Sequence, residues 1–295
     1  MVSSLVVDNL RAGVSGDGGE YREVLHGISF RIESGQKLAL VGESGSGKSV
    51  AARAVVQLDP DIVLSGSVRI DGQELIGARP RTLRSIRGSR VGFVFQDPLS
   101  ALNPSMRIGW QIMQPLMIRG VSKSESRSRA IAMLERLGLR NAARRFDDYP
   151  HQFSGGMRQR VVMAIALVAE PDFLIADEPT TALDVRVQAD VLDLLDEIVD
   201  ERGTGVLLIT HDLGIVAGFA DDVAVLREGN IVEHAVVDEI YAHPAHPYTR
   251  ALLRAVPRID ADVSLGLASV GHPMTGEYRQ TGVGQSDAGQ TGVEL

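Results

Sequence analysis

The sequence contains no cysteine. Disulfide bonds, thiol catalysis, cysteine-ligated zinc and iron–sulfur clusters are therefore excluded. It also lacks any run of about 18 apolar residues that could span a bilayer. Residues 1–4 lead into a strand-like segment without the basic start of a secretory signal. These absences predict a soluble, cytoplasmic protein.

An excess of positive charge is absent too. The chain of 295 residues has 30 Lys and Arg against 38 Asp and Glu, a net charge of −8. This balance argues against nucleic acid as the main partner, because phosphate backbones bind basic surfaces. Hydrophobic residues make up 44% of the chain and charged residues 23%, which is ordinary for a globular protein with a core. The length exceeds the ~100–200 residues typical of one domain, which predicts one large domain with an insertion or a tail.

The most specific pattern present is Gly42-Glu43-Ser44-Gly45-Ser46-Gly47-Lys48-Ser49. It fits G-x-x-x-x-G-K-[ST], the phosphate-binding loop. The three glycines allow positive φ and close approach to an anion, and successive backbone N–H groups form a nest for phosphate oxygens. Lys48 adds a cation for the β- and γ-phosphates, and the Ser49 hydroxyl can ligate Mg²⁺. A strand at 37–41 and a helix at 50–56 flank the run, which favours nucleotide binding over a Gly/Ser linker.

Two carboxylates, Asp177 and Glu178, end the apolar strand that begins at Phe173. Groups at the carboxyl end of a strand in an open α/β sheet face the ligand crevice. Asp177 is thus placed to hold Mg²⁺, and Glu178 could polarise the attacking water. A solvated acidic turn is the alternative, which the phosphate loop disfavours because a metal-bound triphosphate needs such a carboxylate.

The order of elements predicts an α/β fold with a mainly parallel, doubly wound sheet. Strands are expected at 5–7, 28–32, 66–72, 91–95, 172–176, 205–209 and 222–226, helices at 79–90 and 187–199, and a glycine-rich turn at 13–19. From Asp97 to about Gln152 the helical period takes over. One apolar helix face there is formed by Ile131, Leu134, Leu137 and Leu139. The tail after about residue 264 has few apolar residues and is expected to be disordered.

A second glycine-rich segment, Phe153-Ser154-Gly155-Gly156-Met157, opens a helix. Ser154 can N-cap this helix while Gly155 and Gly156 leave backbone N–H groups bare, so the segment predicts a second anion site. Two phosphate-binding devices in one chain resemble the ATP-binding subunit of an ABC transporter. The segment is similar to the family signature Leu-Ser-Gly-Gly-Gln, in the form seen in its peptide-importer branch. The resemblance runs from about Leu5 to Pro257.

Further segments resemble family motifs in the expected order. Gln96 resembles the Q-loop, residues 182–184 (Ala-Leu-Asp) the D-loop, and His211 the switch histidine. Tyr21 becomes a candidate for stacking on adenine, although a half-exposed strand aromatic is the alternative reading. The resemblance implies a P-loop NTPase of the ABC ATPase fold, with an N-terminal antiparallel β subdomain and a helical subdomain inserted at about 97–160. The nucleotide-binding domain would span 1–257, and 258–295 would be an extension.

The resemblance also implies a mechanism. Two nucleotide-binding domains lie head to tail, so that Ser154, Gly155 and Gly156 of one contact a γ-phosphate held by the other. Glu178 acts as general base, His211 contacts the γ-phosphate, and Gln96 senses nucleotide. Ser49, Gln96 and Asp177 are the expected Mg²⁺ ligands.

The same resemblance implies the partners. These are a second ABC ATPase subunit, either a copy or a homologue, two integral membrane permease subunits and, indirectly, an extracytoplasmic substrate-binding protein. The helical insertion would carry the groove for a coupling helix of a membrane subunit. The chain would then lie on the cytoplasmic face of the membrane, and its function would be ATP hydrolysis that drives peptide import.

Residues 243–253 resemble the His-Pro-Tyr-Thr region of oligopeptide, dipeptide and nickel importer ATPases. A metal site at His243 and His246 is disfavoured, since two prolines break any helix that would align them and no further ligand set is nearby. The iron–sulfur cluster of some branch members cannot form without cysteine. The alternatives are import of nickel or another solute, and a non-transport ABC ATPase of the DNA-repair, chromosome or translation type. The latter is disfavoured because zinc cysteines, a long coiled-coil insertion and a second cassette are all missing.

Overall fold

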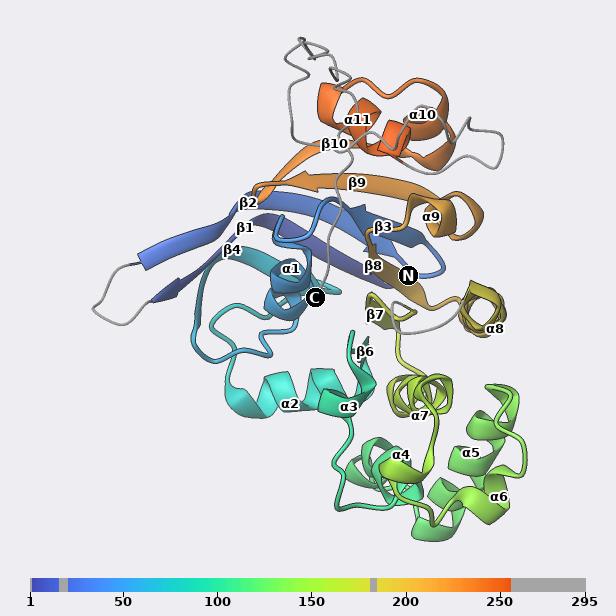
Figure 1. Cartoon of the computed structure of the whole chain (residues 1–295). Coiled ribbons are helices and arrows are strands. Elements are labelled where there is room, and N and C mark those ends of the chain that lie inside the picture. The colour runs from blue at the N-terminus through green and yellow to red at the C-terminus, as the bar shows by residue number, and fades with distance from the viewer. Residues whose placement is uncertain (1, 16–20, 181–184, 256–295) are drawn as a thin grey trace, which may run out of the picture.

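The computed structural model describes residues 2–15, 21–180 and 185–255. Two sheets form its framework (Figure 1). The first has the strand order β2-β1-β4-β5 and is antiparallel throughout. The second has the order β10-β9-β3-β8-β7-β6, in which only the β10–β9 pair is antiparallel. The expected antiparallel N-terminal sheet and mainly parallel central sheet are both confirmed.

The strands of the antiparallel sheet are β1 (Ser4–Ser15), β2 (Tyr21–Glu33), β4 (Ile62–Ile70) and β5 (Gln73–Glu74). Those of the central sheet are β3 (Lys37–Val41), β6 (Val91–Val94), β7 (Phe173–Asp177), β8 (Gly205–Thr210), β9 (Asp222–Arg227) and β10 (Asn230–Val236). The central strands β3, β7 and β8 are buried throughout, which is why their sequences are continuous apolar runs.

Some helices pack on the two sheets. Those that lie between β6 and β7 in the sequence form a separate helical layer. The helices are α1 (Lys48–Val55), α2 (Pro80–Ser89), α3 (Pro98–Ala101), α4 (Ile108–Ile118), α5 (Lys123–Arg136), α6 (Ala142–Arg145), the 3₁₀ turn η1 (Pro150–Gln152), α7 (Gly155–Leu167), α8 (Val185–Arg202), α9 (Leu213–Phe219), α10 (Val237–Ala242) and α11 (Pro247–Ala255). None of the helices in the described residues is long and apolar enough to cross a membrane.

The helical layer is built as expected, with shifted boundaries. Leu134, Leu137 and Leu139 are buried in its core and Ile131 packs against it. The helix itself ends at Arg136, because Gly138 adopts a left-handed φ of 72° that terminates it. Helix α7 continues past residue 160 to Leu167 and lies tightly on β6, where a Cβ on Gly92 would lie 2.4 Å from a carbonyl oxygen of that helix.

Other expectations need correction or lie outside the described residues. Strand β1 continues through Gly13 to Ser15, because its antiparallel pairing with β2 extends that far; the expected turn therefore cannot begin at Gly13. Strand β10 and helices α9 to α11 were not expected from the sequence. Residues 182–184 and the extension at 258–295 lie outside the described residues.

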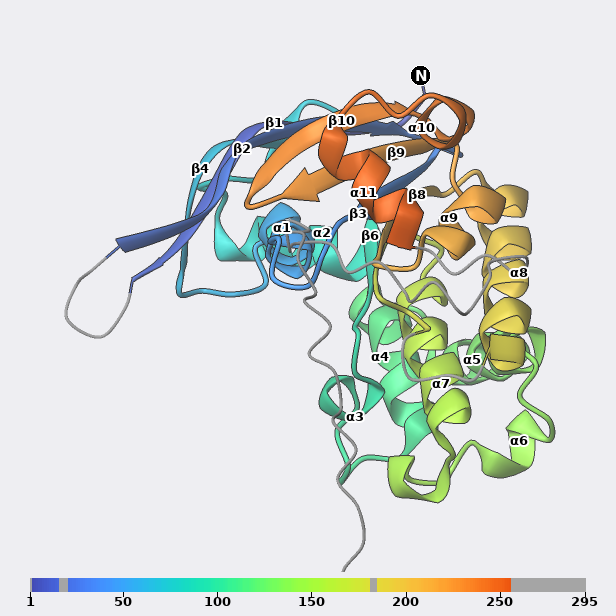
Figure 2. The same ribbon diagram turned by 45° about the horizontal axis from the view of Figure 1, so that its top comes forward.

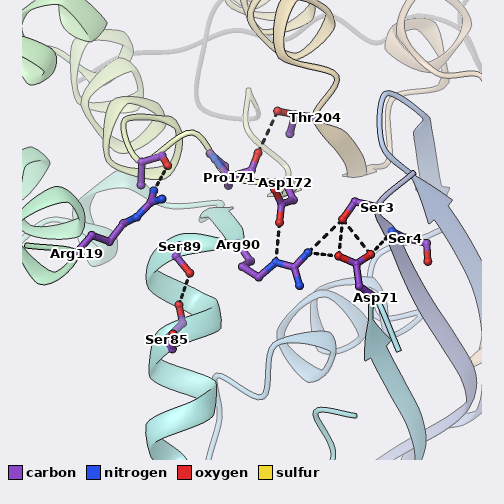
Figure 3. Close-up of polar contacts among 11 residues, drawn as sticks. Ser3, Ser4, Asp71, Ser85, Ser89, Arg90, Arg119, Pro171, Asp172 and Thr204 are labelled. Atoms are coloured by element: carbon purple, nitrogen blue, oxygen red, sulfur yellow. Dashed lines mark hydrogen bonds and ion pairs between the residues drawn. The ribbon is translucent and has the colours of Figure 1, made fainter. Parts of the chain in front are cut away.

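A polar network joins the two sheets near the starts of β1, β6 and β7 and the end of β4 (Figure 3). Arg90, just before β6, donates from Nε to Asp172 Oδ2 at 2.6 Å and from Nη2 to Asp71 and to Ser3 Oγ. The Ser4 amide also donates to Asp71, at 2.8 Å. Burial alone would raise the pKa of Asp71, but the bonds from Ser4, Arg90 and Ser3 outweigh it and lower the pKa. The charged form of Asp71 therefore ties the antiparallel sheet to β6 and β7.

Candidate nucleotide-binding site

The phosphate loop connects β3 to α1 and is pressed between β2 and β9. Gly42 and Gly47 have φ of 155° and 106°, and Gly45 has 82°, so the expected positive φ is confirmed at all three. A Cβ on Gly42 would lie 2.1 Å from the Leu226 carbonyl oxygen, and one on Gly47 would lie 3.0 Å from Leu25 Cδ2. Glycine is required at Gly42 because the backbone of β9 leaves no room for a side chain, and at Gly47 because of its positive φ.

Lys48 is buried inside the loop that it serves. Its Nζ donates to the carbonyl oxygens of Gly42 and Glu43, at 2.7 Å each. Burial lowers the pKa of Lys48, while the nearby charges of Glu178, Asp177 and Glu43 oppose this effect. The loop thus holds a cation opposite two strand-end carboxylates, in the arrangement expected of a site for a polyphosphate.

Ser49 and Asp177 meet at the end of β7. The Ser49 hydroxyl donates to Asp177 Oδ1 at 2.9 Å. Burial raises the pKa of Asp177, and the bond from Ser49 and the charge of Arg53 oppose this. A hydroxyl and a carboxylate in contact are the hard oxygen ligands that Mg²⁺ takes beside a nucleotide phosphate, so these two residues fit a magnesium ion.

Glu178 is held between two of the other predicted residues. Gln96 Nε2 donates to its Oε2 at 2.8 Å, and His211 Nδ1 lies 3.1 Å from its Oε1. Glu178 has a φ of 46°, a left-handed conformation that is unusual for a residue with a side chain, and its amide donates to the Ile209 carbonyl at 2.9 Å. Such strained backbone persists where surrounding structure enforces it, often at functional sites. The carboxylate is therefore aimed and held, as a general base must be.

The second glycine-rich segment is separate from the loop. Ser154 is at the N-cap position of α7, but its hydroxyl makes no capping hydrogen bond, so the expected cap is wrong in that respect. Ser154 and Gly155 are exposed, and a Cβ on Gly155 would meet nothing within 4 Å. Figures 1 and 2 show α7 among the helices of the insertion and α1 beside the sheets, apart from each other. One chain does not bring these two glycine-rich segments together.

Phe153 and Met157, where that segment differs from the family signature, both contact Arg145. Phe153 is buried in the helical core, with the Arg145 guanidinium 4.2 Å from its ring centroid. Arg145 Nη1 also lies 3.4 Å from Met157 Sδ, and its Nε donates to Asp148 at 3.1 Å. Arg145 thus supports both flanks of the open helix N-terminus. Sequence reasoning missed it, because nothing in its local pattern distinguishes it from a surface arginine.

Tyr21 is not brought to the phosphate loop. Its ring lies where a Cβ on Gly13 would stand, on the same strand face as Glu23. A register shift between Ala12 and Gly13 interrupts the alternation of β2, and Glu23 contacts the exposed His26 at 3.1 Å, whereas Leu25 is buried next to the loop. These contacts do not involve the loop, and adenine stacking by Tyr21 stays a prediction.

His243 and His246 lie between α10 and α11, where His246 Nδ1 accepts from the Tyr248 amide at 3.2 Å. In the part of the chain that the structure describes, no three His, Cys, Asp or Glu side chains converge on a metal position.

A phosphate loop beside a strand-end carboxylate pair, with a helical insertion that opens a second helix N-terminus, defines an ATP-binding cassette. The chain belongs to the ABC transporter family, whose pattern it matches over residues 25–181. Residues 232–275 match a second family, the oligopeptide/dipeptide transporter C-terminal region.

Named relatives share most of the chain. It is 50% identical over 242 residues to the oligopeptide transport ATP-binding protein OppD of Lactococcus lactis subsp. cremoris, covering 81% of this chain and 72% of the relative. It is 43% identical over 273 residues to the dipeptide transport ATP-binding protein DppD of the same subspecies, covering 91% and 78%. The structure resembles a dimeric ATP-binding cassette in a post-hydrolysis state bound to ADP and phosphate, with a TM-score of 0.71 and 29% identity over 79% of this chain and 98% of the other.

Proposed function

We propose that this chain hydrolyses ATP as the energising subunit of an importer of oligopeptides or dipeptides. The observation that carries the proposal is the Glu178 carboxylate, held by Gln96 and His211 beside the phosphate loop. This arrangement combines a base, an anion-binding loop and a buried cation within one crevice at the carboxyl ends of the parallel strands.

The residues have distinct tasks in this proposal. Residues 42–49 bind the triphosphate through backbone N–H groups and Lys48. Ser49 and Asp177, with Gln96, would hold Mg²⁺, which neutralises phosphate charge when bound. Glu178 orients the attacking water and accepts its proton, and His211 contacts the γ-phosphate.

The site would be completed by a second subunit. Ser154, Gly155 and Gly156 open a 13-residue helix whose N-terminus faces outward, where it could receive a phosphate from another chain. They do not contact the phosphate loop of their own chain. A head-to-tail dimer, with either a copy or a homologue, would bring them to the γ-phosphate.

A membrane subunit would bind beside the helical insertion. An apolar groove there is lined by residues of α2, β6 and α7, by Pro115 of α4 and by Phe95, which follows β6. Phe95 is partly exposed and adjoins Gln96, so a helix seated in this groove would act on the residue that holds Glu178. The proposal places the chain on the cytoplasmic face of the membrane with two permease subunits and, indirectly, a substrate-binding protein.

Peptides are favoured over nickel by residues 232–275, because the C-terminal region they match is that of oligopeptide and dipeptide transporters. The relatives named above are peptide transport proteins, which points the same way. A non-transport ATPase has no comparable support.

The test is co-expression with candidate permease subunits, purification of the complex and reconstitution into proteoliposomes. ATP-driven uptake is then measured for a dipeptide, a longer peptide and Ni²⁺, with the Glu178→Gln complex as control. Uptake of peptide that the control lacks supports the proposal. A fully active soluble form without membrane partners, or uptake of Ni²⁺ alone, would contradict it.

A further inference from the structure

We propose that Tyr248 is a positioning residue for the phosphate loop, so that the segment resembling a C-terminal transporter region forms part of the nucleotide site. The inference rests on the proposed ATP site and assigns a task to a residue outside its motifs. Tyr248 lies in α11, 206 positions after Gly42, yet it touches the loop directly: the Glu43 amide donates to its hydroxyl at 3.0 Å.

This contact uses one of the backbone N–H groups of the loop. Because the Glu43 N–H is occupied by Tyr248, it is not directed at a phosphate, and the nest is left to the amides that follow it. Burial raises the pKa of Tyr248, which keeps its hydroxyl neutral in the physiological range. The Arg227 guanidinium lies over the ring, 5.0 Å from its centroid, and so restricts the movement of the ring and its hydroxyl.

A short chain of hydrogen bonds sets the position of Tyr248. Glu233 on β10 accepts from the amides of Ala245 and His246, at 2.7 and 2.9 Å. His246 Nδ1 then accepts from the Tyr248 amide at 3.2 Å. The turn before α11 is therefore folded onto β10, and the first turn of α11 is delivered to the loop.

A second contact from the same part of the chain reaches the loop. The Gly229 amide, in the turn between β9 and β10, donates to the Ser46 carbonyl at 2.9 Å. The loop backbone is thus hydrogen-bonded to the C-terminal part of the chain at two positions, Glu43 and Ser46. A surface hollow at this place is lined by residues from the loop, the β9–β10 turn and α11. The C-terminal segment behaves as a brace for the loop.

The experiment compares Tyr248→Phe with Tyr241→Phe in the full-length chain. Both changes remove one hydroxyl from the C-terminal segment, but the Tyr241 hydroxyl donates to the Leu213 carbonyl, away from the loop. Lys48→Ala serves as the variant defective in ATP binding. The dissociation constant for Mg²⁺-ATP is measured by titration calorimetry, thermal unfolding is recorded, and KM and kcat are measured in the assembled complex.

We expect Tyr248→Phe to raise the dissociation constant and KM for ATP roughly tenfold, since a loop amide loses its hydrogen-bond partner and the loop loses its position. The value of kcat should be unchanged, because the loop binds ground state and transition state alike. Tyr241→Phe should bind ATP like the wild type. Wild-type affinity in Tyr248→Phe, or equal losses in both tyrosine variants, would overturn the inference. Failure of the wild type to bind ATP more tightly than Lys48→Ala would instead refute the proposed function.

Discussion

Gln96 donates a hydrogen bond of 2.8 Å to Glu178, a residue 82 positions later in the chain. The other oxygen of the same carboxylate faces His211, which follows β8. The two neighbours thus come from the ends of different parallel strands, β6 and β8, with β7 between them. Strand order and register bring the three strand ends side by side, and the left-handed backbone of Glu178 directs its carboxylate between the two neighbours.

Glu178→Gln tests the assignment of the base. Glutamine retains the size of the side chain but cannot accept a proton from water. We expect unchanged ATP binding and turnover lower by roughly 10²–10⁴-fold in the assembled complex, measured as phosphate release. Glu197→Gln, an exposed carboxylate on α8, is the matched control and should keep full activity. Full activity in Glu178→Gln would refute the assignment.

Ser154→Asp tests whether the second helix N-terminus acts on another chain. Aspartate is a good N-cap and favours a helix N-terminus, so α7 should be at least as stable. Its charge would face a phosphate in the dimer, where like charges cost several kcal/mol, so turnover should fall roughly 100-fold or more. The isolated chain should bind ATP normally, because Ser154 does not contact its own loop. Weakened ATP binding by the isolated variant would show that the segment acts within one chain.

Asp177→Asn should separate stability from magnesium binding. The pKa of Asp177 is raised above its ordinary value of 3.8 by burial, so the folded chain binds this proton more tightly than the unfolded chain. The free energy of unfolding therefore begins to fall as the pH rises past 3.8, and the loss is complete once the pH exceeds the raised pKa of the folded chain. At pH about 7 the nucleotide-free variant should unfold at a higher temperature than the wild type, while its Mg²⁺-dependent ATP binding should weaken roughly tenfold or more.

The control is to repeat the same unfolding measurement at acidic pH. The difference in unfolding temperature should vanish below pH 3.8, where the wild-type carboxyl is also neutral. A variant that is less stable than the wild type at neutral pH would contradict the argument from burial.

Asp71→Asn should change the stability in the opposite direction to Asp177→Asn. The pKa of Asp71 is lowered, so its stabilising contribution is complete above its ordinary value of 3.8 and is lost as pH falls through the lowered pKa. The free energy of unfolding of the variant should fall below that of the wild type at neutral pH, and the two should converge in acid. Urea unfolding at a series of pH values measures this. Asp61→Asn, at an exposed carboxylate just before β4, is the matched control and should keep the wild-type free energy of unfolding at neutral pH; equal losses in the two variants would contradict a special role for the network.

Much of the fold could be predicted because its patterns are local. The runs that became β3, β7 and β8 are apolar over their whole length, and glycines stand where the loop needs a positive φ. The segment after Arg227 was harder to predict. Its strand β10 is only half-buried and its helices are short, so neither period is strong enough to be recognised. Adenine stacking by Tyr21 stays a prediction, because a register shift between Ala12 and Gly13 interrupts the strand alternation around it and the sequence does not reveal that shift.

The sequence by itself determined the chemistry of the nucleotide site: a glycine-rich loop with Lys48 and Ser49, two carboxylates after an apolar strand, and an absence of cysteine. These follow from residue types in short patterns, which carry their physical meaning without the rest of the chain. Only the tertiary structure decided which of these groups meet. It placed Glu178 between Gln96 and His211, kept Ser154 away from the loop of its own chain, and set Tyr248 against Glu43. Contacts between such distant residues depend on strand order, register and bulges, which act over the whole sheet and leave no mark on any single stretch of sequence.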